Sequence, residues 1–407
     1  MPAAFRPRRL AQAALTVALI GIAGCVQNPN SVFHSRTDFN RDVTWLFTII
    51  MWAGLIVFVF TEAMLLYAIW RFRARPGAPR PEQVHGNTKL EILWTAIPAV
   101  VLAIIAVPTV TTIFKTQARA SADALQIEVI GHQWWWEFRY PQYGITTANE
   151  VYMPLGRTIS FALTTKDVIH SFWIPALGGK RDLVNNRTNH IWFTADSTTE
   201  DAFNGFCAEY CGTSHANMRF KAFTVTAEQF ESWAAHQRRP AVFPPPPPPA
   251  PVRGRAAAAA PAPASAPQGF IAFDRARMPA YTIPMTPIPA SVNFDTTLVG
   301  DPQRGAQLTA TGQCALCHTV NGVPTLAAKT GPDLTHVGSR HTIAGGLFPN
   351  DTRHLAAWIK NSRAMKPGSL MNTLGIGQYD PILRNTLQFG LTDQQIADIV
   401  AYLQALK

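Results

Sequence analysis

The chain contains two apolar stretches that are long enough to cross a membrane. They read WLFTIIMWAGLIVFVFTEAMLLYAIW and ILWTAIPAVVLAIIAVPTVTTIF, and each exceeds the roughly 20 residues that span hydrocarbon as a helix. The segment between them is rich in arginine, and short loops of this kind stay in the cytoplasm. The sequence therefore predicts a hairpin with transmembrane helices at 45–71 and 91–115 and a cytoplasmic loop at 72–90. Everything after residue 115 then lies on the exported side.

The amino terminus is typical of an export signal. Three arginines precede an apolar run that ends in IAGC, which is the order of a signal peptide. This ending resembles the processing site of bacterial lipoproteins. It predicts a signal peptide at 1–24, an acylated Cys25 and an exported segment at 25–44. An ordinary signal peptide, or a first membrane helix with an incidental cysteine, is the alternative.

Three regions of different composition follow the second apolar stretch. Residues 124–239 contain short segments rich in β-branched and aromatic residues, such as LQIEVIG and TISFALTT, which predict a β-sandwich or barrel. Residues 240–294 include six consecutive prolines, a stiff spacer of roughly 19 Å, and are expected to form a linker. Residues 295–407 favour helices, and the last of these starts with a capping box from Thr392 to Gln395.

The charge distribution argues against nucleic-acid binding. The formal net charge is +10, but most of the excess lies in residues 1–123, beside the apolar stretches, where cytoplasmic loops collect arginine. None of the segments expected to fold carries a strong basic surface. We therefore expect no nucleic-acid partner.

The segment FCAEYCGTSHANM places four metal-ligating side chains on one predicted loop. Thiolate, imidazole and thioether are the ligands of copper electron-transfer sites, which also use a second histidine. His170, in DVIHSFWIP at the end of a predicted strand, is the best placed. Because one copper ion needs only one thiolate, Cys207 and Cys211 together indicate two copper ions bridged by both sulfurs. A disulfide is the alternative in an oxidising compartment, but it would leave His215 and Met218 unexplained.

The last region contains CALCH, the attachment pattern of c-type haem. Cys314 and Cys317 would form thioethers to the haem, and His318 would become an axial iron ligand. A zinc or redox site is the alternative, but the predicted export suits cytochrome maturation better. A methionine is expected as the other axial ligand, and both Met365 and Met371 lie in AMKPGSLM.

DVIHSFWIP and CAEYCGTSHANM, together with LEILWTAIPA in the second span, resemble subunit II of the haem-copper cytochrome c oxidases over residues 45–238. The resemblance implies a cupredoxin fold that holds the binuclear CuA centre. The side chain of Glu209 corresponds to the family residue that ligates magnesium at the contact with subunit I. The copper ligands implied by the resemblance are His170, Cys207, the backbone carbonyl of Glu209, Cys211, His215 and Met218.

Other positions take roles from the same resemblance. Trp134, in GHQWWWEF, falls where electrons reach CuA. Glu91 aligns with a carboxylate at the mouth of a proton channel, and a plain interfacial charge that caps the helix is the competing interpretation. HLAAWI and KPGSLM resemble class I cytochromes c, which favours Met371 over Met365 and places Pro332 against the proximal histidine.

The complete order of segments resembles subunit II of caa3-type oxidases, which are proton-pumping enzymes of the bacterial inner membrane. This implies a multidomain membrane protein with a two-helix hairpin, an all-β cupredoxin sandwich and an all-α class I cytochrome c domain on the periplasmic side. Electrons from cytochrome c or a similar donor would pass through one haem c and CuA to haem in subunit I, where O2 is reduced to water. The chain itself would then hold no catalytic residue.

The same resemblance names the partners, which are subunit I, subunit III, the electron donor and the lipid membrane. Two alternatives stay open. A nitric oxide reductase with a CuA subunit could use a similar chain to accept electrons. A copper-binding chaperone also uses C-x3-C with a histidine, although it would lack the hairpin and the haem motif.

Overall fold

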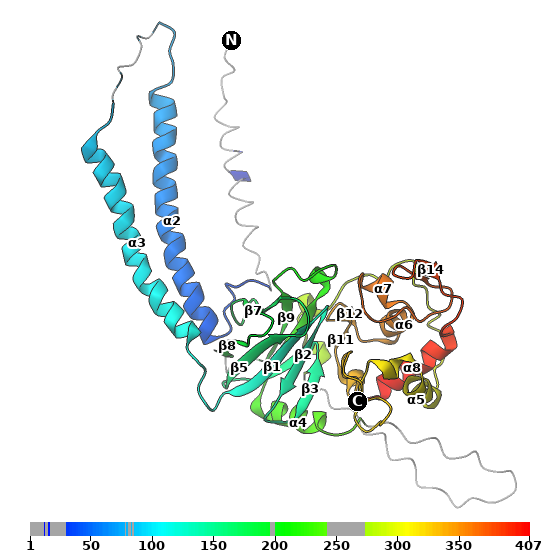
Figure 1. The fold of residues 1–407 in the computed structure, drawn as a ribbon. Coiled ribbons are helices and arrows are strands. Elements are labelled where there is room, and N and C mark those ends of the chain that lie inside the picture. Colours follow the sequence, from blue (N-terminus) through cyan, green and yellow to red (C-terminus); the bar gives the residue numbers. More distant parts are fainter. Residues whose placement is uncertain are drawn as a thin grey trace, which may run out of the picture.

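The computed structural model describes residues 30–77, 85–195, 200–241 and 273–407, together with the isolated positions 12, 15, 16, 79 and 83. These residues form two long helices, a β-sandwich and a smaller helical domain (Figure 1). The long helices leave one end of the sandwich, and the helical domain packs against another part of it. The three-part architecture expected from the sequence is confirmed.

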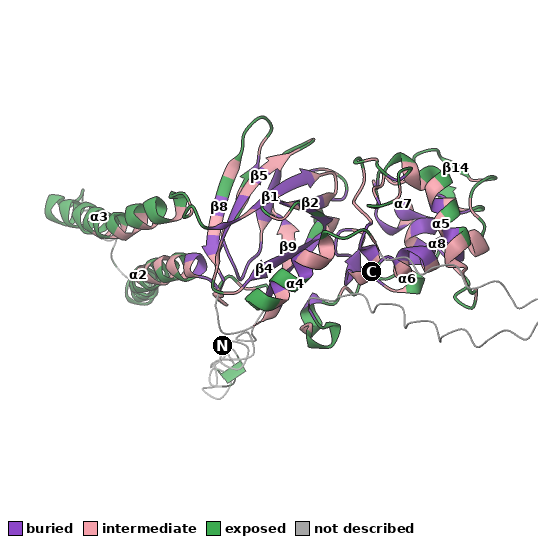
Figure 2. Cartoon of the chain, turned by 90° about the horizontal axis from the view of Figure 1, so that it is seen from below, coloured by how far each residue is buried: buried purple, intermediate pink, exposed green. Residues whose placement is uncertain are grey.

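The two long helices are α2 (Asp38–Arg71) and α3 (Thr88–Gln117). Their apolar windows contain no buried residue, as Figure 2 shows, so they present their side chains to a membrane or a partner. Helix α2 begins before residue 45 because its first turn packs on the sandwich. The Thr37 hydroxyl caps this turn by accepting a hydrogen bond from Asn40 N at 3.0 Å, and Asn40 Nδ2 donates to Ala176 O at 3.2 Å.

The sandwich consists of two five-stranded sheets with the strand orders β3-β2-β1-β5-β8 and β4-β10-β9-β6-β7. The pairs β1–β5 and β4–β10 are parallel, and the other neighbours are antiparallel. The strands of the first sheet are β1 (Leu125–His132), β2 (Trp135–Tyr140), β3 (Ile145–Ala148), β5 (Thr158–Thr165) and β8 (Asn189–Thr194). The strands of the second are β4 (Glu150–Pro154), β6 (His170–Trp173), β7 (Arg181–Leu183), β9 (Asp201–Cys207) and β10 (Arg219–Val225). Helix α4 (Ala227–Gln237) follows β10 and starts with a capping box.

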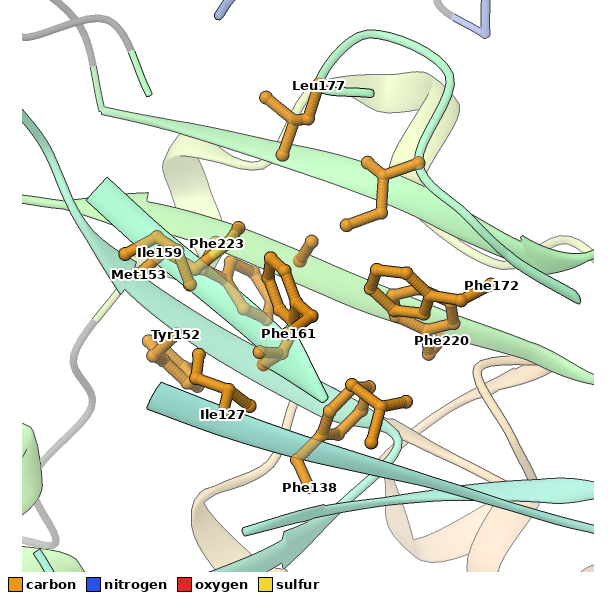
Figure 3. Packing of buried hydrophobic residues seen from close by; sticks show 14 of the residues in the cluster. Ile127, Phe138, Tyr152, Met153, Ile159, Phe161, Phe172, Leu177, Phe220 and Phe223 are labelled. Atoms are coloured by element: carbon orange, nitrogen blue, oxygen red, sulfur yellow. The ribbon is translucent and has the colours of Figure 1, made fainter. Parts of the chain in front are cut away.

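Aromatic side chains fill the space between the two sheets (Figure 3). Phe172 stacks on Phe220 with 5.1 Å between ring centroids, and Phe161 lies at the same distance from Phe172. Gly205 interrupts the aromatic pattern of β9 because the ring of Phe220 covers it, and a Cβ there would lie 2.1 Å from Phe220 Cζ. This interior fixes the sheets against each other, and with them the loops that they carry.

The helical domain is built around α5 (Pro302–Thr311) and α8 (Asp393–Ala405). Gly305 lets these helices approach closely, because a Cβ there would lie 1.9 Å from Asp398 O. The capping box predicted at Thr392 and Gln395 is present at the start of α8. The other elements are η4 (Gln313–Leu316), η5 (Val337–Ser339), β11 (Thr342–Ile343), β12 (Phe348–Pro349), α6 (Thr352–Lys360), α7 (Ser362–Met365), β13 (Tyr379–Asp380) and β14 (Asn385–Thr386).

The described end of the segment expected to be a linker runs along the sandwich. It contains the short helices η2 (Arg275–Arg277) and η3 (Ala280–Thr282). Phe273 is 2% exposed and belongs to the core of the sandwich, and Tyr281 O accepts a hydrogen bond from Asn204 Nδ2 at 3.0 Å. The chain is therefore attached to the sandwich before it enters the helical domain.

Replacing Gly205 by alanine should destabilise the sandwich. The new methyl group would overlap the buried ring of Phe220, and overpacking of this kind costs about 1–3 kcal/mol of unfolding free energy. Thermal unfolding of the purified chain would measure it. The double variant Gly205→Ala/Phe220→Leu should recover part of the loss, and an unchanged midpoint for Gly205→Ala would contradict the packing described.

Candidate metal and haem centres

The predicted copper ligands lie together where β6 begins, β9 ends and β10 is about to begin. Cys207 Sγ and Cys211 Sγ are 3.8 Å apart, both thiols are free, and a disulfide bond measures about 2.0 Å. His170 Nδ1 lies 3.8 Å from Cys207 Sγ, and His215 Nδ1 lies 3.6 Å from Cys211 Sγ. Met218 Sδ is 3.8 Å from Cys211 Sγ. His170 thus starts a strand, rather than ending one as predicted.

Backbone groups complete this cluster. The carbonyl oxygen of Glu209 is 3.2 Å from Cys207 Sγ, while the Glu209 residue is exposed. Gly212 has φ +108°, and a Cβ there would lie 3.1 Å from Gln133 Nε2. The turn between Cys211 and His215 therefore needs glycine to bring both side chains to the same side.

Asp167, three residues before His170, was not predicted as part of the site. Its carboxylate accepts a hydrogen bond from His170 Nε2 at 2.8 Å and is held by the backbone N–H groups of Gln133 and Val168. Burial alone would lower the pKa of His170, but the hydrogen bonds with Asp167 and Cys207 outweigh it and raise that pKa. A carboxylate that accepts a hydrogen bond from the outer nitrogen fixes the ring with Nδ1 toward the sulfurs. Histidines that bind a metal are commonly oriented by such an acceptor. An aspartate close in sequence to a ligand histidine was the available signal.

The pKa values of the two thiols are shifted in opposite directions. The contact with Cys211 lowers the pKa of the Cys207 thiol, and the same contact raises the pKa of Cys211. A positive metal charge would favour the thiolate form of both. The donor set of two thiolates, two imidazoles, a thioether and a carbonyl is soft and largely buried, and it fits copper.

The predicted haem ligands line a cavity of about 290 Å³ in the helical domain. Cys314, Cys317, His318 and Met371 all face it, whereas Met365 is 4% exposed and packs in the hydrophobic core. His318 Nδ1 donates a hydrogen bond to the backbone oxygen of Pro332 at 2.8 Å, as expected. Burial lowers the pKa of His318, so the ring is held neutral with Nε2 free for iron.

Arg340 also lines this cavity and was not predicted. Its Nη2 donates to Asp333 O, and burial lowers the pKa of its guanidinium. Within the described part of the chain, no group accepts a hydrogen bond from Arg340 Nε. A buried guanidinium with a spare donor fits the carboxylates of a haem group, which supports haem as the occupant.

Trp134 links the two centres. Its side chain lines the haem cavity together with Gln133 and Trp135. On the other side, Trp134 Nε1 donates to the carbonyl oxygen of Cys211 at 2.9 Å, and Gln133 Nε2 donates to the same oxygen at 2.8 Å. The sandwich thus supplies part of the cavity wall of the helical domain.

Comparison with known proteins identifies the family. Models of the periplasmic domain of cytochrome c oxidase subunit II, of its transmembrane domain and of cytochrome c match residues 144–225, 33–112 and 302–407. The chain is 32% identical to cytochrome c oxidase subunit 2 of Alkalihalophilus pseudofirmus, over 97% of this chain and 96% of that protein. The chain belongs to the cytochrome c oxidase subunit II family. Subunit 2 of Bacillus subtilis is 31% identical over 91% of this chain and 89% of its own length.

This subunit II is an oxidoreductase subunit that carries a C-terminal cytochrome c domain, and family membership implies copper and haem. Its two apolar helices anchor it in a membrane. The solved periplasmic domain of subunit II of cytochrome oxidase from Bradyrhizobium japonicum is 31% identical over 30% of this chain and 97% of that chain, with a TM-score of 0.28.

Two further predicted sites of subunit II are Glu91 and Cys25. Glu91 is exposed in the first turn of α3, and the helix is capped by Asn87, whose side chain accepts hydrogen bonds from the N–H groups of Lys89 and Leu90. The capping function proposed as the alternative for Glu91 thus belongs to Asn87. Cys25 lies outside the described residues.

Changing Asp167 to asparagine should weaken copper binding. His170 would lose its carboxylate acceptor, and loss of such a contact typically lowers metal affinity about 10- to 100-fold. Copper competition with a chelator, together with the mixed-valence EPR signal, would measure this. Asp182→Asn is the matched control, because Asp182 is exposed on β7. Equal affinities for both variants would contradict the assigned contact.

Leucine substitutions should show which of the two methionines is the axial ligand. Met371→Leu should abolish the low-spin, methionine-ligated visible spectrum, because Met371 faces the haem cavity. Met365→Leu should leave the spectrum intact and cost less than about 1.5 kcal/mol of stability, as core exchanges of equal volume do. The opposite pattern would show that Met365 is the ligand.

Proposed function

We propose that this chain is the electron-accepting subunit of a caa3-type, proton-pumping cytochrome c oxidase. Its C-terminal domain would take electrons from cytochrome c or a similar donor, and its sandwich would deliver them to haem in subunit I, where O2 is reduced to water. The observation that supports this most directly is the position of Trp134, which touches both the haem cavity and the carbonyl of Cys211.

In the C-terminal domain, the side chains have separate tasks. Cys314 and Cys317 would hold one haem c through thioether bonds, and His318 and Met371 would be the axial ligands. Arg340 would pair with a haem carboxylate. The hydrogen bond from His318 to Pro332 fixes the ring orientation, so the ligand does not need to reorganise on a change of charge.

In the sandwich, Cys207 and Cys211 would bridge two copper ions, and His170, His215, Met218 and the carbonyl of Glu209 would complete the ligand set. Bound haem c and bound CuA each take up and release one electron. The ligands are fixed to strands whose aromatic interior is closely packed, and a rigid ligand set limits the geometric change that accompanies each transfer.

Trp134 and Cys211 connect the two ligand sets. The indole ring lines the cavity beside the haem ligands, and its Nε1–H reaches a backbone oxygen of a copper ligand. This hydrogen bond would serve as the step from the cavity wall to the copper ligand. The ring is half-buried, so the surrounding protein also limits solvent access to the path.

The remaining assignments concern the surroundings of the complex. Subunits I and III would border the hairpin, and the exposed Glu209 side chain would help to hold a magnesium ion at the contact with subunit I. Glu91 would lie at the mouth of a proton channel. The two redox domains would lie on the periplasmic side of the inner membrane, with Cys25 as an additional lipid anchor.

Replacing Trp134 by phenylalanine in the purified oxidase should slow copper reduction after the haem has been reduced. The variant keeps an aromatic ring but loses the hydrogen bond to Cys211. Without it the ring is no longer held in position, and such a loss of positioning can slow a step about tenfold to a hundredfold. Stopped-flow spectra of haem and CuA would measure the rate.

Trp135→Phe is the matched control, because Trp135 lines the same cavity but stacks on His132 at 4.1 Å between ring centroids. Its rate should stay close to that of the unchanged protein. A Trp134→Phe rate equal to that of the control would remove Trp134 from the path.

A further inference from the structure

Two buried ionisable side chains, an acid and a base, join the helical domain to the sandwich. Neither is among the predicted ligands, although Lys366 also lines the haem cavity. Glu150, on β4, is 2% exposed, and Lys366, after α7, is 4% exposed. Burying a charge is costly unless it is paired or hydrogen-bonded. Glu150 finds its hydrogen-bond partners on the other domain, and Lys366 finds one partner there and one in its own domain.

The carboxylate of Glu150 is saturated by the helical domain. Its Oε1 accepts hydrogen bonds from His341 N and Thr342 N, both at 2.8 Å, and from Thr342 Oγ1 at 3.1 Å. Its Oε2 is 3.4 Å from His341 Nδ1. Burial would raise the pKa of Glu150, but these contacts outweigh it and lower that pKa. The ionised form is therefore stabilised by hydrogen bonds that the docked helical domain supplies.

Lys366 makes the reciprocal contact. Its Nζ donates to Trp134 O at 2.6 Å across the interface and to Ala344 O at 3.1 Å within its own domain. The next residue, Pro367, accepts a hydrogen bond on its carbonyl from the Ser214 hydroxyl.

Gly368 then lies against the indole of Trp134, and a Cβ there would lie 2.9 Å from the ring. The turn 366–368 therefore rests on Trp134 and on Ser214, which precedes the copper ligand His215. The same turn leads, within three residues, to the haem ligand Met371.

The chain on both sides of residues 242–272 is fixed at the same interface. Before this segment, Arg239 O accepts a hydrogen bond from His336 Nε2 at 3.0 Å, and Ala241 packs against the core of the helical domain. After it, Phe273 is buried in the sandwich, and its carbonyl accepts a hydrogen bond from His341 Nε2 at 2.9 Å. The contacts that hold the domains together thus include the residues on both sides of 242–272.

We propose that Glu150 and Lys366 are positioning residues that seat the helical domain on the sandwich, so that the haem and copper ligand sets work in one fixed contact. The role of this contact in electron transfer rests on the proposed function. The contact itself involves only side-chain and backbone groups of this chain. Transfer by a swinging domain is the arrangement that this proposal excludes.

Cutting the linker tests the proposal without an activity assay. A protease site placed within residues 242–272 of the full-length chain, in the membrane-bound oxidase, would turn an intramolecular contact into a bimolecular one. After cleavage, the haem-bearing fragment should stay with the membranes. Lys366→Met and Glu150→Gln should each weaken its retention about 10- to 100-fold, because each removes hydrogen bonds to a charged group. Sedimentation over a dilution series would give the dissociation constant.

Lys329→Met and Glu228→Gln are matched controls, because both residues are exposed and lie on the helical domain and on α4, respectively. The haem spectrum and the copper EPR signal of each cut sample would confirm that both domains are folded. If Glu150→Gln does not fold, the retention measured for Lys366→Met tests the proposal by itself. Release of the fragment from the cut but otherwise unchanged protein, or equal retention in Lys366→Met and its control, would overturn the proposal.

A second measurement connects the contact to function. In the uncut oxidase, Lys366→Met should slow copper reduction by the haem while both spectra stay unchanged, and added viscogen should slow the variant but not the unchanged protein. A rate in the unchanged protein that falls in proportion to viscosity would show a moving domain. Failure of the proposed function would instead appear as absent haem or copper signals, with retention of the fragment unaffected.

Discussion

The carbonyl oxygen of Cys211 accepts hydrogen bonds from two side chains, Gln133 and Trp134. It belongs to a predicted copper ligand, and both donors line the cavity of the haem domain. The rest of the structure holds this junction in place. The aromatic interior fixes the strands that carry His170 and Cys207, Gly212 permits the tight turn, and Asp167 orients the histidine ring. Donors and acceptor all belong to the sandwich, so a shift of the helical domain would separate all three from the rest of the cavity wall.

Much of the candidate site could be predicted because its chemistry is local in sequence. Five of the six predicted copper ligands lie within twelve positions, and the haem cysteines and His318 lie within five. The apolar stretches of the hairpin and the capping box of α8 depend only on nearby residues in the same way. His170 could be found because its segment matched a known family, although its place at the start of β6 depends on pairing with Leu183 of β7, which no local pattern contains.

The features that could not be predicted depend on contacts between residues far apart in the chain. Strand β9 contains a glycine that only the ring of Phe220 explains. Arg340 could be recognised as a cavity residue only after the fold had brought it beside His318, and the partners of Glu150 lie 191 and 192 positions away. Helix α2 begins earlier than its apolar stretch because its first turn packs on a sandwich that starts much later in the sequence. Tertiary contacts decided each of these features.

The carboxylate of Glu150 also limits how freely this fusion protein can exchange its modules. A cytochrome c domain transplanted from another protein would bring its own CxxCH motif and methionine, and could bind haem without difficulty. It would not bring Thr342 and the His341 backbone to a carboxylate that is buried only when they are present. The graft would leave an unsatisfied charge on the face of the recipient, so the two domains have to change as a pair even though each has its own hydrophobic core.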